Sequence, residues 1–218
     1  PQDGEYSEIA VRQHNGFELG GTVKGSFDDA VRAVAAEFNS FAEAYRRNVA
    51  GELADTVEKA AFLNWSCMVA PRGHFRRHAM LMSKNWMTNV WSWDHAINAL
   101  ALAKHHPELA WDQMLTVFDS QLPSGQLPDF INDAVRLCNY VKPPIHGWIL
   151  GLMMGRNSWF DDLDRLQAFY EPLERWTEWW LRFRIREGLG LPEYYHGNDS
   201  GWDNGTVFDG GVPALSPD

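Results

Sequence analysis

The segment with the clearest chemical potential lies at residues 196–205, which read His-Gly-Asn-Asp-Ser-Gly-Trp-Asp-Asn-Gly. It places two acids and one large aromatic side chain among residues that favour turns, so it predicts a loop. Loops held by a rigid scaffold often carry catalytic residues, and an acid presented there can donate or accept a proton. Asp203 is our first candidate for such a proton donor, with Trp202 beside it as an apolar shield. The alternative is a turn acid whose carboxylate binds nearby backbone amides.

A second candidate lies at residues 91–94, which read Trp-Ser-Trp-Asp. The flat ring of Trp91 can lie under a ligand while the Asp94 carboxylate accepts protons from hydroxyl groups at its edge, and sugar binding needs that pairing. The alternative is an ordinary helix start, in which Ser92 caps the helix and Asp94 stabilises the helix dipole. Both interpretations place these side chains at the entrance of a helix.

Two further polar segments are weaker signals. Residues 125–129 and 142–144 are ordinary turn and helix-start sequences when taken singly, although Lys142 would suit a hydrogen bond to a sugar hydroxyl. His74 and His78 lie four residues apart, but no Glu follows His74 as a zinc protease requires, so we expect no metal site. None of these motifs indicates a cofactor.

Helices are the elements expected to hold these segments. Apolar residues recur at three- and four-residue spacing through most of the chain, and no segment alternates like a β-strand. The expected helices begin at Ser26, cover residues 52–68, follow residues 91–94, begin at Pro107, cover residues 131–139, begin at Pro143 and cover residues 161–186. Gly147, Gly151 and Gly155 form one stripe, where we expect a neighbouring helix to approach closely. Short loops between the helices indicate antiparallel helix pairs and an all-α fold.

Composition limits the possible partners. The 218 residues, 45% of them hydrophobic, are enough for one or two globular domains. A net charge of −10 repels polyanions, so we expect no nucleic acid as a partner. No stretch approaches the roughly 20 apolar residues of a membrane helix, so we expect a soluble chain with no membrane partner. The chain begins with Pro1 rather than Met, so we expect an upstream portion, with any targeting segment, to lie outside it, and the localisation stays open.

Taken together and in this order, the motifs resemble glycoside hydrolase family 63 and its neighbours. These include processing α-glucosidases, glucosylglycerate and mannosylglycerate hydrolases and, more distantly, trehalases. The motifs that carry the resemblance lie at residues 91–95, 125–129, 142–144 with Trp148, and 198–204. The resemblance implies an (α/α)6 barrel with a pocket at one end. It also implies inverting, exo-acting hydrolysis of an α-glucoside or a related α-linked sugar, with a small carbohydrate as the substrate and no cofactor.

The resemblance also assigns roles to individual residues. Asp203 takes the position of the family's general acid, which protonates the glycosidic oxygen as the bond breaks. The residues that it places around the sugar are Trp91, Asp94, Lys142, Gly201 and Asn204. Trp91 and Asp94 are expected to hold the terminal sugar, and Lys142 is expected to make a polar sugar contact.

The resemblance covers only part of the family's pattern. The family's general base, a Glu, lies well downstream of the acid, and this chain ends at Asp218, before that position. Inversion needs two carboxylates about 6.5–9.5 Å apart with a water between them. We therefore expect residues 1–25 to be a linker or the end of a preceding domain, and residues 26–218 to form the N-terminal portion of the barrel, about half of it. A missing segment or a second chain would complete the barrel, and the isolated chain is expected to be inactive.

Two other functions remain open. A sugar isomerase or epimerase on the same barrel would use a histidine pair for proton transfer, and the candidates are His95, His146 and His196. It requires two of these rings to face one pocket. A non-catalytic, helical sugar-binding module would show the same motifs, because the base is what this chain lacks.

Overall fold

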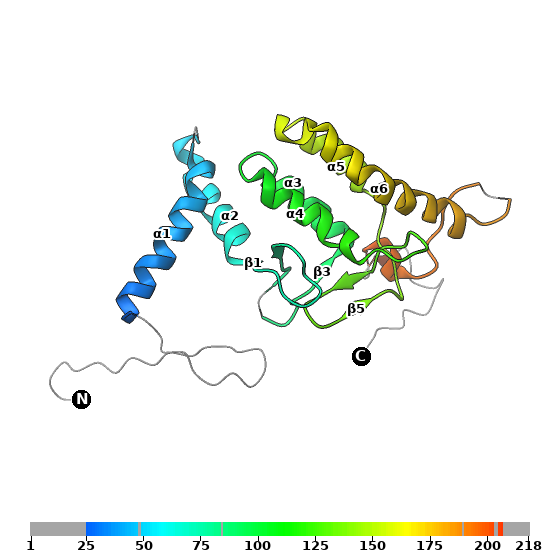
Figure 1. The fold of residues 1–218 in the computed structure, drawn as a ribbon, viewed down its shortest axis with the longest axis horizontal. Helices are drawn as coiled ribbons and strands as arrows, with labels where there is room; N and C mark the ends of the chain where they lie inside the picture. Colours follow the sequence, from blue (N-terminus) through cyan, green and yellow to red (C-terminus); the bar gives the residue numbers. More distant parts are fainter. Residues whose placement is uncertain (1–24, 48, 84, 189, 203–204, 207–218) are drawn as a thin grey trace. The chain divides into compact units, whose positions relative to one another are not determined.

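The computed structural model describes residues 25–47, 49–83, 85–188, 190–202 and 205–206. Contacts divide the chain into an N-terminal unit, Pro1–Trp65, and a C-terminal unit, Ser66–Asp218. Figure 1 shows the helices and strands of both units. The expected linker over residues 1–25 lies outside the described residues, except for Gly25.

Two helices make up most of the described part of the N-terminal unit. They are α1 (Phe27–Arg46) and α2 (Ala54–Ser66), with a 3-10 turn at Gly51–Leu53 between them. Ser26 caps α1 as predicted, because its hydroxyl accepts a hydrogen bond from the Asp29 N–H while the Asp29 carboxylate accepts one from the Ser26 N–H. Ala42, Tyr45 and Ala61 form the buried core of the pair. Both expected helices are confirmed, to within two residues at their ends.

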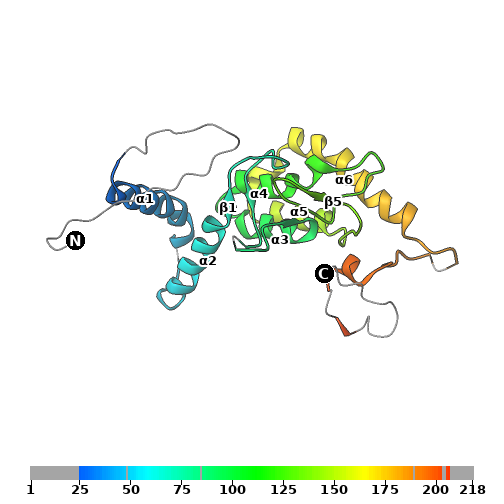
Figure 2. The same cartoon turned by 90° about the horizontal axis from the view of Figure 1, so that it is seen from below.

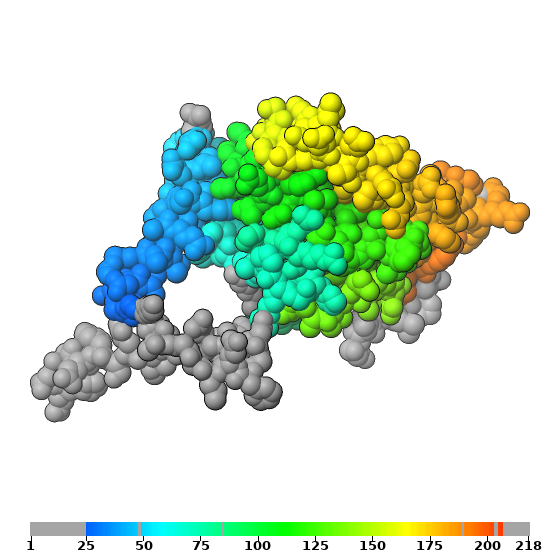
Figure 3. Space-filling view, in the orientation of Figure 1, coloured from blue at the N-terminus to red at the C-terminus, as the bar shows by residue number. Residues whose placement is uncertain are grey.

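Within the described residues, four α-helices lie in the C-terminal unit. They are α3 (Ser92–Leu102), α4 (Pro107–Thr116), α5 (His146–Met154) and α6 (Leu163–Phe183). α3 contacts both α4 and α5, and α6 contacts α5 through the Trp176 and His146 rings. Figures 1 and 3 show α6 along the top of the C-terminal unit. The core lies among these helices, and its largest fully buried side chains include Trp176, Phe160, Leu102 and Met114. These four expected helices are confirmed, although α5 begins at His146 rather than at Pro143.

Short strands and 3-10 turns lie between the helices. β1 (Met68–Val69) pairs antiparallel with β2 (Ala79–Met80), while β3 (Val90–Trp91), β4 (Phe130–Ile131) and β5 (Arg136–Leu137) form an antiparallel sheet in the order β3-β4-β5. The 3-10 turns are η2 (Phe118–Ser120), η3 (Ser158–Asp161) and η4 (Gly197–Ser200). Since β3 runs directly into α3, the three-stranded sheet lies at the beginning of that helix (Figures 1 and 2). The described chain is therefore mostly helical with two small sheets.

Three sequence-based expectations differ from this structure. No strand was expected, because a two-residue strand is too short to show alternation. The helix expected over residues 131–139 is wrong: β4 and β5 form a hairpin there, and the Asn132 side chain accepts hydrogen bonds from the Ala134 and Val135 N–H groups in its turn. Ser92 does not cap α3, since Trp91 holds the N-cap position and makes no side-chain cap bond.

The glycine stripe of α5 also differs from expectation. A Cβ added at Gly147 would touch only Leu173, and one added at Gly151 would meet no atom within 4 Å. A Cβ at Gly155 would meet only carbonyl oxygens of its own helix. Among the described residues, therefore, no helix approaches this stripe closely enough to require glycine.

Gly125 gives a stability prediction. It has φ +97° in the loop that joins η2 to β4, and a Cβ there would overlap the Arg175 backbone carbonyl of α6. Gly188 has a similar φ of +89° with nothing within 4 Å of an added Cβ, so it is a matched control. We expect Gly188→Ala to cost about 1–2 kcal/mol from backbone strain alone, and Gly125→Ala to cost more because backbone must also move. Urea unfolding compares the two, and equal losses would contradict the close approach.

Candidate functional site

The polar segments meet at the beginning of α3, a place called the α3 entrance below and formed by residues 91–94, 125–129, 142–144 and 196–202. The Ser92 N–H donates to the Asp129 carbonyl oxygen at 3.2 Å, next to the β3–β4 pairing of Trp91 with Phe130. The Trp91 and Phe130 rings lie 5.6 Å apart in a tilted contact. Asp94 lies half-buried in the first turn of α3. The structure therefore brings residues 91–94 and 125–129, which are distant in sequence, to one end of α3.

Lys142 joins two more segments to this place. Its side chain is almost fully buried, and its Nζ lies 3.2 Å from the Asp129 Oδ1 atom. The same ammonium donates a hydrogen bond to the Asn198 carbonyl oxygen at the start of the 198–204 motif. Lys142 thus lies between the two segments as part of their packing. The expected contact between Lys142 and a sugar stays a prediction.

Asp199 is a buried acid in the described part of the 196–205 loop, and sequence reasoning missed it. Only 1% of its surface is exposed. Its Oδ1 accepts a hydrogen bond from the Val141 N–H at 3.1 Å, and its Oδ2 accepts from Arg184 at 2.7 Å and from the Tyr195 and His196 N–H groups at 3.0 and 3.2 Å. Aspartate is rarely buried without such partners, and nothing in the local sequence shows that Arg184 and Val141 lie beside it.

Gly201 explains how the loop reaches α3. It ends η4 in the left-handed conformation, with φ +72°, and a Cβ there would overlap the Trp93 indole. Glycine is therefore needed both for the backbone conformation and for the close approach to Trp93. Trp202 follows with 67% of its surface exposed, and its N–H donates to the Ser200 hydroxyl. Asp203 and Asn204 lie outside the described residues, so their expected roles stay predictions.

Of the three histidines considered for proton transfer, two are buried in the core and the third packs against an aromatic ring. His95 and His146 are both fully buried, and burial lowers the pKa of His95 to about 3 and that of His146 to about 4. The Trp176 indole N–H donates to the His146 Nδ1, so the Nε2–H is the donor to the Ser92 carbonyl oxygen. The His196 ring contacts the Tyr140 ring in a tilted arrangement, with ring centroids 4.7 Å apart. A histidine pair that must reach a substrate is not supported by this arrangement.

The buried histidines predict how stability depends on pH. Their pKa values of about 3 and about 4 lie below the ordinary value of 6.5 that an unfolded chain would show. Between pH 4 and 6.5 the unfolded state binds more protons, so this part of the stability is complete above about pH 6.5 and decreases as pH falls. We expect a loss on the order of 1 kcal/mol per pH unit for each histidine between pH 6.5 and 5.

Urea midpoints at pH 7 and pH 5 measure this effect. The control is exposed His74, whose replacement by Gln should leave the difference between the two midpoints unchanged. His95→Gln should reduce that difference, because the substituted side chain does not titrate. An identical pH dependence in the wild type and in His95→Gln would contradict the assignment.

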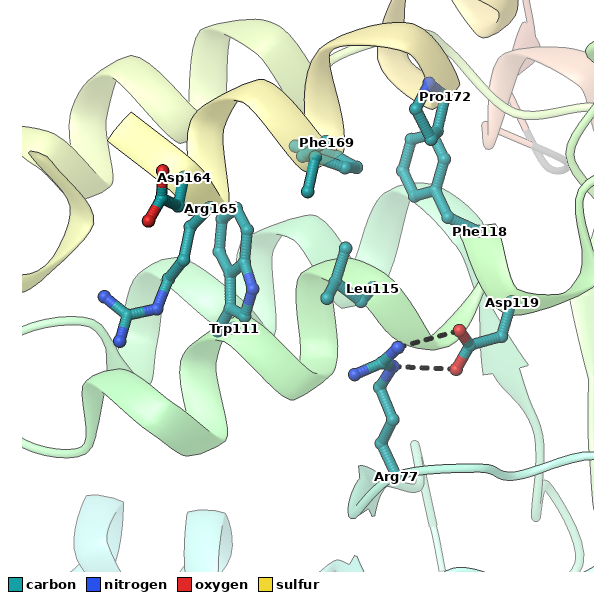
Figure 4. A pocket seen from close by; sticks show the side chains of 10 residues that line it. Arg77, Trp111, Leu115, Phe118, Asp119, Asp164, Arg165, Phe169 and Pro172 are labelled. Atoms are coloured by element: carbon teal, nitrogen blue, oxygen red, sulfur yellow. Dashed lines mark hydrogen bonds and ion pairs between the residues drawn. The ribbon is translucent and has the colours of Figure 1, made fainter. Parts of the chain in front are cut away.

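A hollow lies between α4, η2 and α6 (Figure 4). It has a cavity volume of about 490 Å³ and an aromatic wall formed by Trp111, Phe118 and Phe169. At one end Arg77 donates two hydrogen bonds to the Asp119 carboxylate, at 2.7 and 2.9 Å (Figure 4). None of the candidate residues from the sequence lines this pocket.

Metal sites and membrane helices are both absent from the described residues. No group of three or more His, Cys, Asp or Glu side chains there is arranged to hold a metal ion. No described helix combines the length and the apolar character needed to cross a membrane.

A protein family and several curated proteins are similar to this chain. A family model described as "Mannosylglycerate hydrolase MGH1-like glycoside hydrolase domain" matches residues 87–218, a range that includes all four sequence motifs. The mannosylglycerate hydrolase of Rubrobacter radiotolerans is 27% identical over 55% of this chain and 32% of its own length. Mannosylglycerate hydrolase MGH1 of Selaginella moellendorffii is 23% identical over 55% of this chain and 28% of its own length. The chain thus spans about a third of these curated relatives.

The fold has a counterpart among solved structures. An uncharacterized conserved protein from Thermus thermophilus aligns with a TM-score of 0.56 and 24% identity, covering 69% of this chain and 40% of that one. This likeness concerns the fold alone.

Proposed function

The chain belongs to the mannosylglycerate hydrolase MGH1-like glycoside hydrolase family, and from this membership we propose that the complete protein hydrolyses an α-linked sugar at the α3 entrance. The family resemblance indicated by the sequence motifs is thereby confirmed. The observation that carries the proposal is the meeting of residues 91–94, 125–129, 142–144 and 196–202 at one end of α3. A sugar site needs that convergence of aromatic and carboxylate side chains.

We propose a glycerate glycoside as the substrate class. Both curated relatives carry the name mannosylglycerate hydrolase, which favours a mannosyl group over the glucosyl group that the motifs also permit. In this proposal Trp91 lies under the terminal sugar, Asp94 accepts its hydroxyl protons, and Gly201 and Asn204 line the site. Lys142 either contacts the sugar or supports the residues that do.

We propose an inverting mechanism with Asp203 as the general acid. The acid gives its proton to the glycosidic oxygen as the bond to the sugar breaks, and a second carboxylate activates water on the opposite face. That second carboxylate is supplied by sequence beyond this chain, from the same protein or a second chain, which also completes an (α/α)6 barrel. The isolated 218 residues are then inactive.

Hydrolysis by the complete natural protein tests this proposal. We expect mannosylglycerate to be cleaved faster than glucosylglycerate, and both faster than methyl α-mannoside, which lacks the glycerate group. Proton NMR of the first product should show the anomer opposite to that of the substrate. Binding without turnover of any of these glycosides would favour a non-catalytic sugar-binding module, and a retained anomer would overturn the inverting mechanism.

A further inference from the structure

We propose that Asp199, with Arg184 as its counter-charge, is a positioning residue for the acid loop, defined as residues 196–202, which directly precede Asp203 in the chain. This inference rests on the proposed function, in which Asp203, the residue that follows the acid loop, is the general acid. Asp199 itself is buried and does not touch the substrate. It affects the reaction by holding the loop in the position from which Asp203 can donate its proton.

The first argument comes from the bonds of the carboxylate. Two of its four partners are the N–H groups of His196, the N-cap residue of η4, and of Tyr195 just before it, and these bonds shape the turn itself. The other two partners, Val141 and Arg184, lie outside the loop and fix the turn to its surroundings. One buried side chain therefore sets both the form of the loop and its location.

The second argument comes from a closed circuit of contacts that begins and ends on α6. The Trp176 indole bonds to His146, His146 bonds to the Ser92 carbonyl oxygen, and the Ser92 N–H bonds to the Asp129 carbonyl oxygen. From there the circuit continues through Asp129, Lys142 and the carbonyl oxygen of Asn198. Asp199 follows Asn198 and closes the circuit on Arg184, the C-cap residue of α6.

This circuit fixes the acid loop relative to α3. Ser92 lies between Trp91 and Asp94, the residues proposed to hold the sugar, and Gly201 packs on Trp93 in the same turn of α3. The loop therefore has two attachments near the sugar site, one through Asn198 and Asp199 and one through Gly201. Loss of the Asp199 carboxylate removes the bonds that hold η4 to Val141 and Arg184, while the bond from Lys142 to the Asn198 carbonyl oxygen and the packing of Gly201 on Trp93 remain.

Arg184 is itself held in place. Its guanidinium lies 4.2 Å from the centroid of the Tyr195 ring and 5.2 and 5.8 Å from the Trp179 and Trp180 rings. These cation–π contacts and the buried ion pair leave the guanidinium few other positions. Position 199 requires a carboxylate, because all four partners of its side chain donate hydrogen bonds to it; they are Val141, Arg184, Tyr195 and His196. An amide at this position would place its own N–H against one of them.

The test compares leaving groups in the complete natural protein. Asp199→Asn and Arg184→Gln are assayed on mannosylglycerate, whose leaving group needs a proton, and on 2,4-dinitrophenyl α-mannoside, whose leaving group does not. We expect kcat on mannosylglycerate to fall by about 10²-fold, as misplacement of a reacting group by about 1 Å can cause. On the dinitrophenyl substrate we expect a change below about threefold, and KM should stay within about threefold on both.

Two controls separate the possible outcomes. Arg186→Gln breaks the exposed pair of Arg186 with Glu193, two residues from Arg184, and should leave both substrates unaffected. Circular dichroism establishes the folded fraction of each variant, and Arg184→Gln decides the question if Asp199→Asn does not fold. Equal losses on both substrates would mean a merely structural role and would overturn the proposal.

Asp203→Asn in the same assay distinguishes this inference from the proposed function. If it lowers kcat far more on mannosylglycerate than on the dinitrophenyl substrate while Asp199→Asn and Arg184→Gln do not, only the positioning role of Asp199 is wrong. If Asp203→Asn shows no dependence on the leaving group, the general-acid assignment fails, and the positioning role fails with it.

Discussion

Replacing Asp203 by Asn in the complete protein should lower kcat on mannosylglycerate by about 10²–10⁴-fold, the usual contribution of a general acid. Asn has nearly the same shape but holds no transferable proton, so the glycosidic oxygen would leave as an alkoxide. Substrate binding should change little, because the acid acts mainly in the transition state. We therefore expect KM to stay within about threefold while kcat falls.

Asp161→Asn is the matched control for this variant. Asp161 lies exposed at the end of η3, outside every contact described at the α3 entrance. Its replacement should leave kcat and KM as in the wild type. Steady-state kinetics on mannosylglycerate measures both variants. A kcat for Asp203→Asn within a factor of about three of the wild type would contradict the assignment of the acid, because general-acid catalysis contributes far more than this.

The helices could be predicted from sequence because their signals are local. Ser26 with Asp29 forms a capping box, and Pro107 occupies the first turn of α4. The apolar face of α6 repeats over the whole helix and includes Phe169, Trp176 and Trp180, all of which are buried. Each of these patterns lies within one element, so no knowledge of distant neighbours is needed to interpret it.

The hairpin of β4 and β5 could not be predicted in the same way. Each strand has only two residues, and the pairing of Phe130 with Leu137 is set by the turn at Asn132. The apolar residues of this stretch fit a short helix equally well when no neighbour is known. The sheet becomes necessary only when β3 supplies the partner strand for β4.

Sequence could indicate the motifs of the candidate site but not the buried contacts between them. The four motifs were found because the family pattern orders them along the chain, but their buried contacts join residues far apart. Asp199 lies 58 residues from Val141, and Lys142 lies 56 residues from Asn198. A sequence alone shows an acid and a lysine as two charged side chains, and it does not show that folding removes both from water.

Burial also changes what Lys142 is expected to do. A surface lysine near a sugar would donate hydrogen bonds to hydroxyl groups and could be lost at a cost in affinity alone. In this structure the side chains of Lys142 and Asp129 are only 4% and 6% exposed, and the ammonium also bonds to the Asn198 carbonyl oxygen. The Lys142 ammonium therefore joins three segments of the α3 entrance, at residues 125–129, 142–144 and 196–202.

Lys142→Met should consequently destabilise the protein by about 3–5 kcal/mol, because it removes one partner of a buried ion pair and leaves the other buried. Methionine keeps most of the length and apolar volume of lysine, so the loss reflects the ammonium rather than a cavity. The matched control is Arg72→Met, which breaks the half-exposed pair with Asp133 and should cost about 0–1 kcal/mol.

Urea unfolding and KM together decide between the two roles of Lys142. A loss of stability with an unchanged KM for mannosylglycerate in the folded fraction would assign Lys142 to the support of the loops. A raised KM with unchanged stability would contradict that role and assign Lys142 to the sugar. Because Lys142 precedes Asn198 in the circuit, the supporting role also predicts a leaving-group dependence of kcat like that of Asp199→Asn. Contact with the sugar alone predicts equal losses in kcat/KM for both leaving groups.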